Sequence, residues 1–410
     1  MSVFAQIEIT DSIEMMRETM RESFVEDKFE NKINLGLTSF RNEEGDAWSL
    51  PVVKQAEKVI ASDETLNKAY LPVLGLESFR NVATKLLLGN ESPALLEGRV
   101  FSAQVLSGTG GLRVAAEFLN KHLKYKTVYI SKPGWRNNHL IFKSAKFDNI
   151  QYYRYWNINT KAFALEPMLE DLRRARDHAV IVLQTCAHNP TGCDPTKAQW
   201  IQIAKVVKDK QLFPLLYCPF QGIASGDLDE DAWIVRYFVS HGFEFFCSQA
   251  LVKNFSFCNE RIGNLVCVTK KGNVIKNVKS QLAFIITGWY SNPPVYGARI
   301  VTYILNDPRL RDEWKNNIKR MYLRCKQLKN NLRQALEKLG TPGNWAHITN
   351  QGGMFSQTGL TQQQCIYLMN THHIYIRLCG RINLSTLNAN NINHVAKAIC
   401  DTVKSVPTKE

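Results

Sequence analysis

The chain has 410 residues, of which 45% are hydrophobic and 21% are charged, an ordinary globular composition for one large or two medium domains. Its longest apolar runs, such as 212–216 and 243–246, are far shorter than the roughly 18 to 20 residues that a membrane-spanning helix needs, so we expect no membrane span. The net charge of +14 raises nucleic acid as a partner, but Lys and Arg are spread along the chain without a recognised binding motif, so we expect none.

The cysteines and the first residues bear on the cellular compartment. Ten cysteines are scattered without a CxxC pair, so we expect reduced thiols and no metal site. The opening residues include Glu8, Asp11 and Glu14 and lack a basic segment followed by an apolar one, so neither a secretory signal nor a transit peptide is visible. We therefore expect a cytoplasmic protein.

Short apolar runs alternate with amphipathic stretches along the chain. In chain order, the predicted strands and helices are 127–130, 179–183, 197–208, 213–216, 231–239, 243–247 and 265–268, followed by a long amphipathic helix over 309–338. The pattern predicts an α/β fold with a mostly parallel sheet covered by helices. Ligands of such sheets sit beyond the carboxyl ends of the strands. Four candidate side chains follow apolar runs in this way, namely Trp135, Asn189, Phe220 and Lys253.

A glycine-rich segment, Ser107-Gly108-Thr109-Gly110-Gly111, follows the apolar run 100–106 and opens a helical pattern. Its backbone N–H groups could receive a phosphate at the positive end of the helix. Glycine-rich turns between a strand and a helix are also common for purely structural reasons, so this loop alone does not decide the function.

Several segments together resemble the aspartate aminotransferase family, in its order and at its separations. They are 70–75 (YLPVLG), 186–192 (CAHNPTG), 250–255 (ALVKNF), 259–264 (NERIGN), 291–294 (SNPP) and 380–383 (GRIN). The resemblance runs from about Asn34 to the C-terminus. It implies pyridoxal 5'-phosphate as cofactor, fold type I of the enzymes that use it, and a homodimer with shared active sites. It also implies a large cofactor-binding domain over 44–321 and a smaller α+β domain built from 1–43, with its N-terminal arm, and 322–410.

The resemblance also implies roles for individual residues. Lys253 would bind the cofactor aldehyde covalently and, once freed, move a proton at the substrate Cα. Arg381 would grip the substrate α-carboxylate. At the phosphate, the resemblance implies Ser107, Gly108, Thr109, Arg261 and Tyr70 of the partner subunit. Around the cofactor ring, it implies Trp135, Asn189, Tyr217 and Phe220. At the substrate, Trp135, Asn189 and Thr38 would join Arg381.

The chain departs from the family pattern at five positions. Tyr217 stands where an aspartate keeps the ring nitrogen protonated, and Asn138 where a histidine supports that aspartate. Phe220 replaces a tyrosine, Ala250 replaces a serine, and Thr287 replaces the arginine that binds the side-chain carboxylate of aspartate or glutamate. A tyrosine supplies no negative charge, so the electron-withdrawing power of the ring is weakened. We therefore expect weak transamination or altered specificity.

Three functions remain open at this point. The first is an aminotransferase that converts an amino acid such as L-aspartate and 2-oxoglutarate into an oxo acid and L-glutamate. The second is a cofactor-binding pseudoenzyme or scaffold without transaminase activity, which Tyr217, Asn138, Phe220 and Thr287 favour. The third, an amino-acid racemase, requires a second acid or base on the opposite face of the substrate, and the sequence identifies none.

Overall fold

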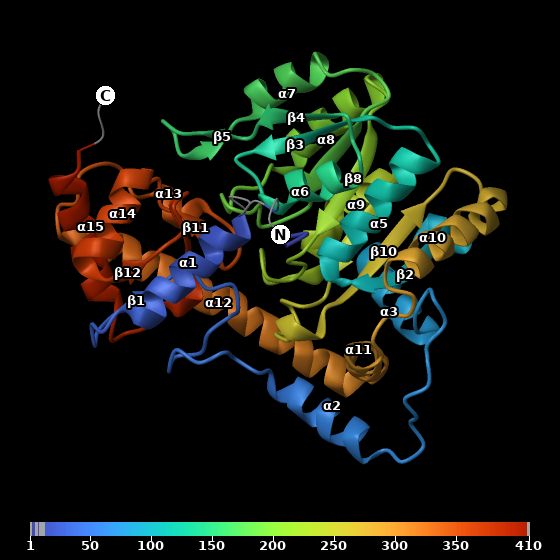
Figure 1. Ribbon diagram of the computed structural model, residues 1–410, viewed down its shortest axis with the longest axis horizontal. Helices are drawn as coiled ribbons and strands as arrows, with labels where there is room; N and C mark the ends of the chain where they lie inside the picture. The colour runs from blue at the N-terminus through green and yellow to red at the C-terminus, as the bar shows by residue number, and fades with distance from the viewer. Residues whose placement is uncertain (1, 5–6, 8–12, 408–410) are drawn as a thin grey trace.

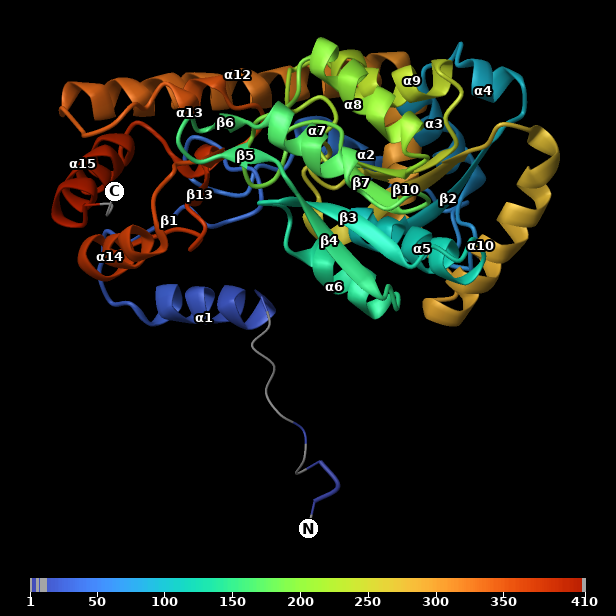
Figure 2. The same cartoon turned by 90° about the horizontal axis from the view of Figure 1, so that it is seen from above.

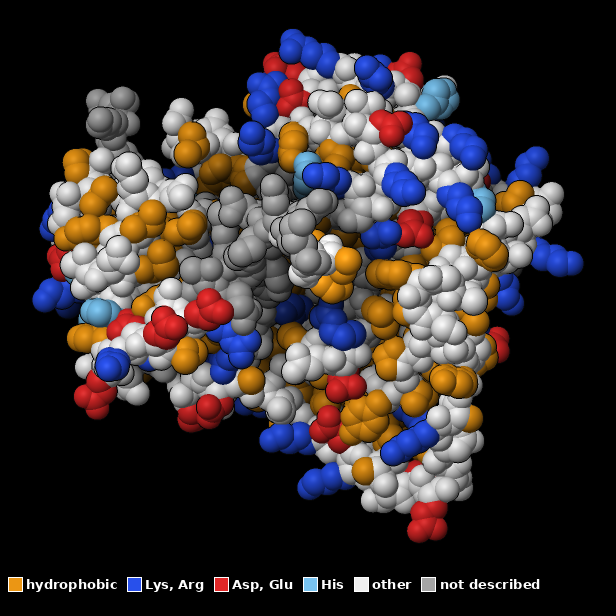
Figure 3. Space-filling model, in the orientation of Figure 1, with side chains coloured by type: hydrophobic (Ala, Val, Ile, Leu, Met, Phe, Trp, Pro, Cys, Tyr) orange, Lys and Arg blue, Asp and Glu red, His pale blue; other side chains and the backbone are white. Residues whose placement is uncertain are grey.

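The computed structural model describes residues 2–4, 7 and 13–407 (Figure 1). Glu8 and Asp11, on which part of the expectation about compartment rests, lie outside the described residues. Within the described part of the chain, no helix combines the length and the apolar character needed to cross a bilayer. On the face shown in Figure 3, Lys and Arg side chains are spread over the surface with acidic side chains among them.

A seven-stranded sheet forms the centre of the larger part of the molecule. Its strands are β2 (Val100–Leu106), β3 (Thr127–Lys132), β4 (Asn149–Arg154), β7 (Val180–Gln184), β8 (Phe213–Cys218), β9 (Phe245–Ala250) and β10 (Ile262–Val268). They lie in the order β2-β10-β9-β8-β7-β3-β4. Neighbours are parallel except for the two pairs that involve β10. The mostly parallel sheet expected from the sequence is confirmed.

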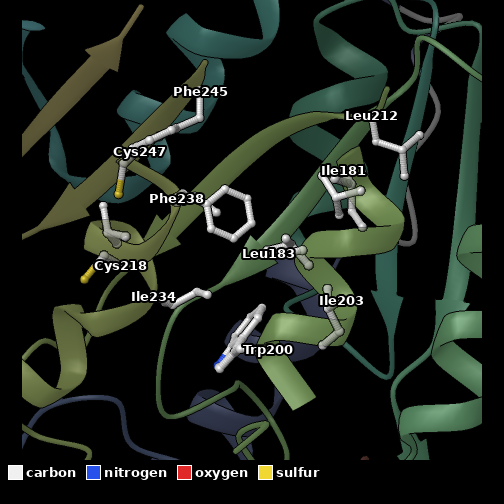
Figure 4. Packing of buried hydrophobic residues seen from close by; sticks show 14 of the residues in the cluster. Ile181, Leu183, Trp200, Ile203, Leu212, Cys218, Ile234, Phe238, Phe245 and Cys247 are labelled. Carbon is white, nitrogen blue, oxygen red and sulfur yellow. The ribbon is translucent and has the colours of Figure 1, made fainter. Parts of the chain in front are cut away.

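Helices cover both faces of this sheet (Figure 2). One face carries α7 (Leu165–Arg173), α8 (Lys197–Asp209) and α9 (Leu228–Ser240), and the other carries α5 (Ser107–Lys121), α6 (Asn137–Ser144) and α10 (Ile275–Trp289). Successive residues of a strand point to opposite faces. Ile181 and Leu183 of β7 therefore pack beside Trp200 and Phe238 (Figure 4), while Val182 belongs to the core on the other face. This two-sided burial explains why the central strands are apolar throughout.

The two ends of the chain meet in a smaller region. Strand β1 (Ile33–Asn34) pairs in parallel with β12 (Ile374–Tyr375), and β11 (Phe355–Gln357) pairs with β13 (Arg381–Asn383). Helices α13 (His347–Asn350), α14 (Gln362–His372) and α15 (Ile392–Ser405) complete this region. Leu35 shares its core with residues from Leu328 to Ile399. The domain boundaries at 43/44 and 321/322 stay predictions.

The long amphipathic helix expected over 309–338 is confirmed as α12 (Pro308–Lys338), which runs from one region into the other (Figure 2). It begins where the Asp307 carboxylate accepts from the Leu310 N–H at 2.9 Å, with Pro308 in the first turn. Its buried residues recur every three or four positions. They include Leu310, Trp314, Ile318, Met321, Cys325, Leu328, Leu332 and Leu336.

The described residues form ten further elements. They are α1 (Ile13–Glu26), α2 (Pro51–Ser62), α3 (Glu77–Leu88), α4 (Pro93–Leu96), α11 (Tyr296–Asn306), β5 (Trp156–Asn157), β6 (Ala162–Phe163), η1 (Cys258–Glu260), η2 (Gly272–Val274) and η3 (Leu384–Thr386). Of these, α2, α3 and α11 contribute buried residues to the core around α12. All ten cysteines are free thiols, as the sequence indicated.

Candidate active site

The candidate residues gather at one edge of the sheet. Trp135 follows β3, Asn189 follows β7, Phe220 follows β8 and Lys253 follows β9. These four strands are parallel neighbours, so their carboxyl ends lie along the same edge. Side chains separated by more than a hundred residues are thereby brought to the place where ligands of α/β sheets bind.

Lys253 is held by two neighbours. Its Nζ donates to the Thr38 carbonyl oxygen at 2.6 Å and to Cys258 Sγ at 3.2 Å. Burial lowers the pKa of Lys253; Cys258 acts in the opposite direction, and the positive charges of Arg381 and Arg261 lower it further. A lowered pKa favours the neutral amine, which is the nucleophilic form.

The phosphate-binding loop predicted at Ser107, Gly108 and Thr109 forms the first turn of α5. Ser107 adopts the left-handed backbone region, with φ of 61°. Among the described residues, no side chain caps this helix start. The N–H groups of a first turn have no partner within the helix and bind anions well. Arg261 lies beyond the loop, exposed, and its Nη1 donates to the Cys258 carbonyl oxygen at 3.1 Å.

Tyr217 lies between the residues predicted to hold the ring and the phosphate. Its ring is 5.4 Å from that of Trp135 and 17° from parallel. A Cβ placed on Gly108 would lie 2.5 Å from Tyr217 Cε2 and 3.2 Å from the Ala250 Cβ. Burial raises the pKa of Tyr217, although Arg261 opposes the shift, so the phenol is neutral. Ala250 adds an apolar contact here.

Asn138, one of the positions that depart from the family pattern, has a side chain that is incompletely hydrogen-bonded within the described part of the chain. Its side-chain Oδ1 is buried and has no hydrogen-bond partner among the described residues. Buried polar atoms are nearly always paired, so such an atom is an exception that needs a reason. The family pattern places a histidine here as support for an aspartate, and Tyr217 does not replace that contact.

Arg381 and Asn189 form the substrate side of the site. Arg381 begins β13 and is 8% exposed, and its Nη1 donates to Asn189 Oδ1 at 3.0 Å. Its guanidinium lies 4.1 Å from the ring centroid of Phe355, which Phe220 contacts edge-on. The Asn189 N–H donates to Gln184 Oε1 at 3.2 Å. A planar guanidinium fixed in this way suits recognition of a carboxylate.

Two aspartates that sequence reasoning missed, the partly exposed Asp194 and the buried Asp231, hold the loops of the site through backbone hydrogen bonds. Asp194 accepts from the backbone N–H groups of Ala187 and His188 at 2.6 and 2.9 Å, and so holds the segment that presents Asn189. Burial raises the pKa of Asp194 to about 6.

The second of these aspartates, Asp231, accepts from the N–H groups of Gly222 and Ala224 at 2.7 and 3.1 Å, and so holds the turn after Phe220. Burial raises the pKa of Asp231 to about 7. Asp194 and Asp231 both line a cavity of about 210 Å³. No pattern marks either aspartate in the sequence, because its importance comes from loops that fold around it.

Two predicted positions stand apart from this cluster. Tyr70 is 90% exposed, and Thr287 is exposed on α10, where its hydroxyl donates to the Ala283 carbonyl oxygen at 2.8 Å. The loop after Tyr70 is tied to the SNPP segment, because Asn292 Nδ2 donates to the Leu71 carbonyl oxygen at 2.6 Å. Both residues are accessible to a second protein chain.

The residues present fit two ends of pyridoxal phosphate. The uncapped start of α5 and the nearby Arg261 offer N–H donors to a phosphate. Burial lowers the pKa of Lys253, which favours the neutral amine that reacts with an aldehyde. At the ring, Trp135 offers an aromatic face, but the neutral phenol of Tyr217 takes the place of a carboxylate.

A mostly parallel sheet of this order, with a desolvated lysine beyond β9, defines the fold type I class of pyridoxal-phosphate proteins. The family model described as "Aminotransferase class I and II" matches residues 30–399. The chain therefore belongs to the class I and II aminotransferase family. Similarity covers nearly the whole chain and includes proteins of several specificities.

Among curated relatives, the cytoplasmic aspartate aminotransferase of Gallus gallus is 45% identical over 410 residues, which is 99% of each chain. Among solved structures, aspartate aminotransferase from Saccharomyces cerevisiae cytoplasm has a TM-score of 0.95 at 40% identity, covering 98% of this chain and 99% of that one. An aromatic-amino-acid aminotransferase from Burkholderia pseudomallei, covalently bound to pyridoxal phosphate, has a TM-score of 0.94 at 35% identity, covering 98% and 100%. The fold type I expectation is confirmed.

Proposed function

We propose that the protein is a pyridoxal-phosphate-dependent amino-acid aminotransferase of the aspartate type, slow or altered in specificity. The observation that carries the proposal is that a desolvated lysine, Lys253, follows β9 at the edge of the central sheet, while a buried arginine, Arg381 of β13, contacts Asn189 at that edge. Together they provide an amine that can react with an aldehyde and a planar guanidinium that can bind an α-carboxylate. The relatives named above support the amino acid and 2-oxo acid as substrates.

When bound, pyridoxal phosphate supplies an aldehyde that captures amines and a ring that withdraws electrons from the substrate Cα. Lys253 would hold the group through its aldehyde. Once an amino acid had displaced it, the Lys253 amine would serve as the base that accepts and donates the proton at the substrate Cα. Arg381 would bind the substrate carboxylate and so orient the Cα–H bond.

The same geometry explains why the reaction should be slow. Tyr217 is neutral and buried, so it does not stabilise a proton on the ring nitrogen as a carboxylate would. Removing one preorganised electrostatic partner costs on the order of 3 kcal/mol in comparable catalytic settings. Without an arginine at Thr287, the side-chain carboxylate of aspartate has no designated partner at that position, so neutral amino acids are better placed to compete.

A second candidate is a cofactor-binding protein that does not transaminate. The observation that favours it is the buried Oδ1 of Asn138, which has no hydrogen-bond partner among the described residues. Racemisation remains the third possibility, and it would need a proton donor on the face of the substrate opposite Lys253.

We also propose a cytoplasmic homodimer. The 90% exposure of Tyr70 supports it, because the family places this residue at the phosphate of the partner subunit. Exposed Thr287 on α10 fits the same arrangement. The location rests on relatives named as cytoplasmic. Light scattering coupled to size exclusion would test the dimer, and a monomer at micromolar concentration would contradict it.

The deciding experiment is the visible absorption spectrum of the purified protein with pyridoxal phosphate, before and after L-aspartate or other amino acids are added. A band that is absent in Lys253→Ala and that converts to pyridoxamine phosphate with some amino donor would establish an aminotransferase. A band that no donor converts would establish the second candidate. Loss of deuterium from Cα with formation of the D-amino acid would instead establish racemisation.

A further inference from the structure

Lys253 has a neighbour that the proposed mechanism does not use. The lysine and Cys258 belong to the loop between β9 and β10, which turns back on itself after the lysine. The Ser256 N–H donates to the Lys253 carbonyl oxygen at 3.1 Å, and Ser256 adopts a left-handed φ of 55°. The turn returns Cys258 to the lysine side chain, where Nζ and Sγ are 3.2 Å apart.

We propose that Cys258 and Lys253 form an oxidative modification site, at which peroxide converts the thiol and the amine into a covalent sulfur–nitrogen bond. The bond would close a ring within a single loop. It goes beyond aminotransferase activity, because it requires the two side chains and an oxidant but no turnover.

The chemistry balances in two steps. Hydrogen peroxide first oxidises the Cys258 thiol to a sulfenic acid, R–SH + H₂O₂ giving R–SOH + H₂O. The lone pair of the neutral Lys253 amine then attacks the sulfur, the sulfenic oxygen leaves as water with one amine proton, and R–S–NH–R' remains. A sulfenic acid is known to condense with a nitrogen in this way when the nitrogen is close. The linked protein has lost two hydrogen atoms overall.

Exposure and the contact with an amine together distinguish Cys258 from the other cysteines. Of the ten thiols, all in the described part of the chain, eight are buried, and Cys258 and Cys379 are partly exposed. Peroxide can therefore reach Cys258, and a nitrogen nucleophile already touches its sulfur.

The charged neighbourhood supplies the amine in its reactive form. Burial lowers the pKa of Lys253, and Arg381 and Arg261 face it with further positive charge. Arg261 also donates to the Cys258 carbonyl oxygen, and Thr38 accepts from the lysine through its own carbonyl, so both ends of the pair are held. These contacts favour bond formation over reaction of the sulfenic acid with an external thiol.

The bond and the cofactor would compete for one atom, Lys253 Nζ. Protein first loaded with pyridoxal phosphate should resist linkage, and linked protein should fail to develop the lysine-dependent absorption band. Excess dithiol should cleave the bond, regenerate both side chains and restore the band.

The test treats full-length protein with hydrogen peroxide, with and without pyridoxal phosphate, and follows peptides by mass spectrometry. We expect a product that joins Cys258 to Lys253, lighter by two hydrogen atoms and reversed by dithiothreitol. Cys258→Ser should abolish it, and Cys379→Ser, which removes the other partly exposed thiol, should leave it unchanged. Thermal denaturation of each variant shows whether it is folded.

Two results would overturn the proposal. One is wild-type protein in which Cys258 gains oxygen while Lys253 remains free. The other is an equal yield, in Cys258→Ser, of a product that has lost two hydrogen atoms and joins Lys253 to a different cysteine. Both results are measured as covalent mass, so they can be distinguished from a failure of the protein to transaminate.

Discussion

The rings of Tyr217 and Trp135 lie nearly parallel, 17° apart in orientation and 5.4 Å between centroids. The tyrosine also packs against Gly108 at the first turn of α5. One side chain thus contacts both the aromatic face and the phosphate loop that the cofactor would use. It fills with a neutral phenol the position where the family pattern has a carboxylate.

Tyr217→Asp, combined with Asn138→His, should strengthen cofactor binding and speed the half-reaction with an amino donor. A charged hydrogen bond contributes about 1.5 to 3 kcal/mol, so we expect a gain of roughly ten- to 150-fold. Fluorescence titration with pyridoxal phosphate and single-turnover absorbance measure the two effects. Tyr217→Phe keeps the ring without the hydroxyl and should resemble wild type; an equal gain in that control would show that charge is not the cause.

Thr287→Arg should shift the substrate preference toward aspartate. The residue is exposed on α10, so an arginine fits without burial, and in a dimer it could reach the side-chain carboxylate of a substrate. We expect kcat/KM for L-aspartate relative to L-alanine to rise roughly ten- to 150-fold. Thr287→Lys restores charge without the planar fork and should gain less. No change in the ratio for either variant would place another residue at the side-chain pocket.

Arg381→Lys should weaken substrate binding while leaving the cofactor band in place. Lysine cannot reproduce the two parallel hydrogen bonds to a carboxylate or the stacking on Phe355, where the guanidinium lies 4.1 Å from the ring. The apparent affinity for amino acids should fall about tenfold or more in spectral titrations. Arg309→Lys, on the exposed side of α12, is the matched surface control. Unchanged amino-acid affinity in Arg381→Lys would remove this arginine from the substrate site.

Stability should fall as pH rises from about 4 to 7, because Asp231 holds its proton in the folded state. Burial raises its pKa to about 7 from the ordinary 3.8, with Asp194 adding negative charge nearby. A raised carboxyl pKa stabilises the fold fully below the unfolded value, and this contribution is lost as pH approaches the folded value. Asp231→Asn keeps an acceptor for Gly222 and Ala224 without titrating.

The free energy of unfolding, measured in denaturant across this range, should decline less in Asp231→Asn than in wild type, by on the order of 2 kcal/mol. Parallel curves for the two proteins would show that Asp231 does not titrate with folding.

The fold was largely predictable because it depends on local patterns. Apolar runs such as 179–183 are strands buried on both faces, and the helix over 309–338 was readable from its spacing. Lys253, Asn189 and Arg381 were also predictable, because they lie in short motifs and the resemblance to the family depends on residue identity. The start of β9 was less accurate: the predicted strand began at Phe243, whereas the strand begins at Phe245 because Phe243 lies in the turn after α9.

What the sequence determined by itself was which residues are present and which are missing, including Tyr217, Asn138 and Thr287. Only the tertiary structure decided their contacts. The Tyr217 ring contacts Trp135 and Gly108, the thiol of Cys258 contacts Lys253, and Asp194 and Asp231 hold the site loops. The physical reason is that turns of the chain and the order of the strands in the sheet bring these side chains together. A periodic sequence pattern does not show which side chains will meet in this way.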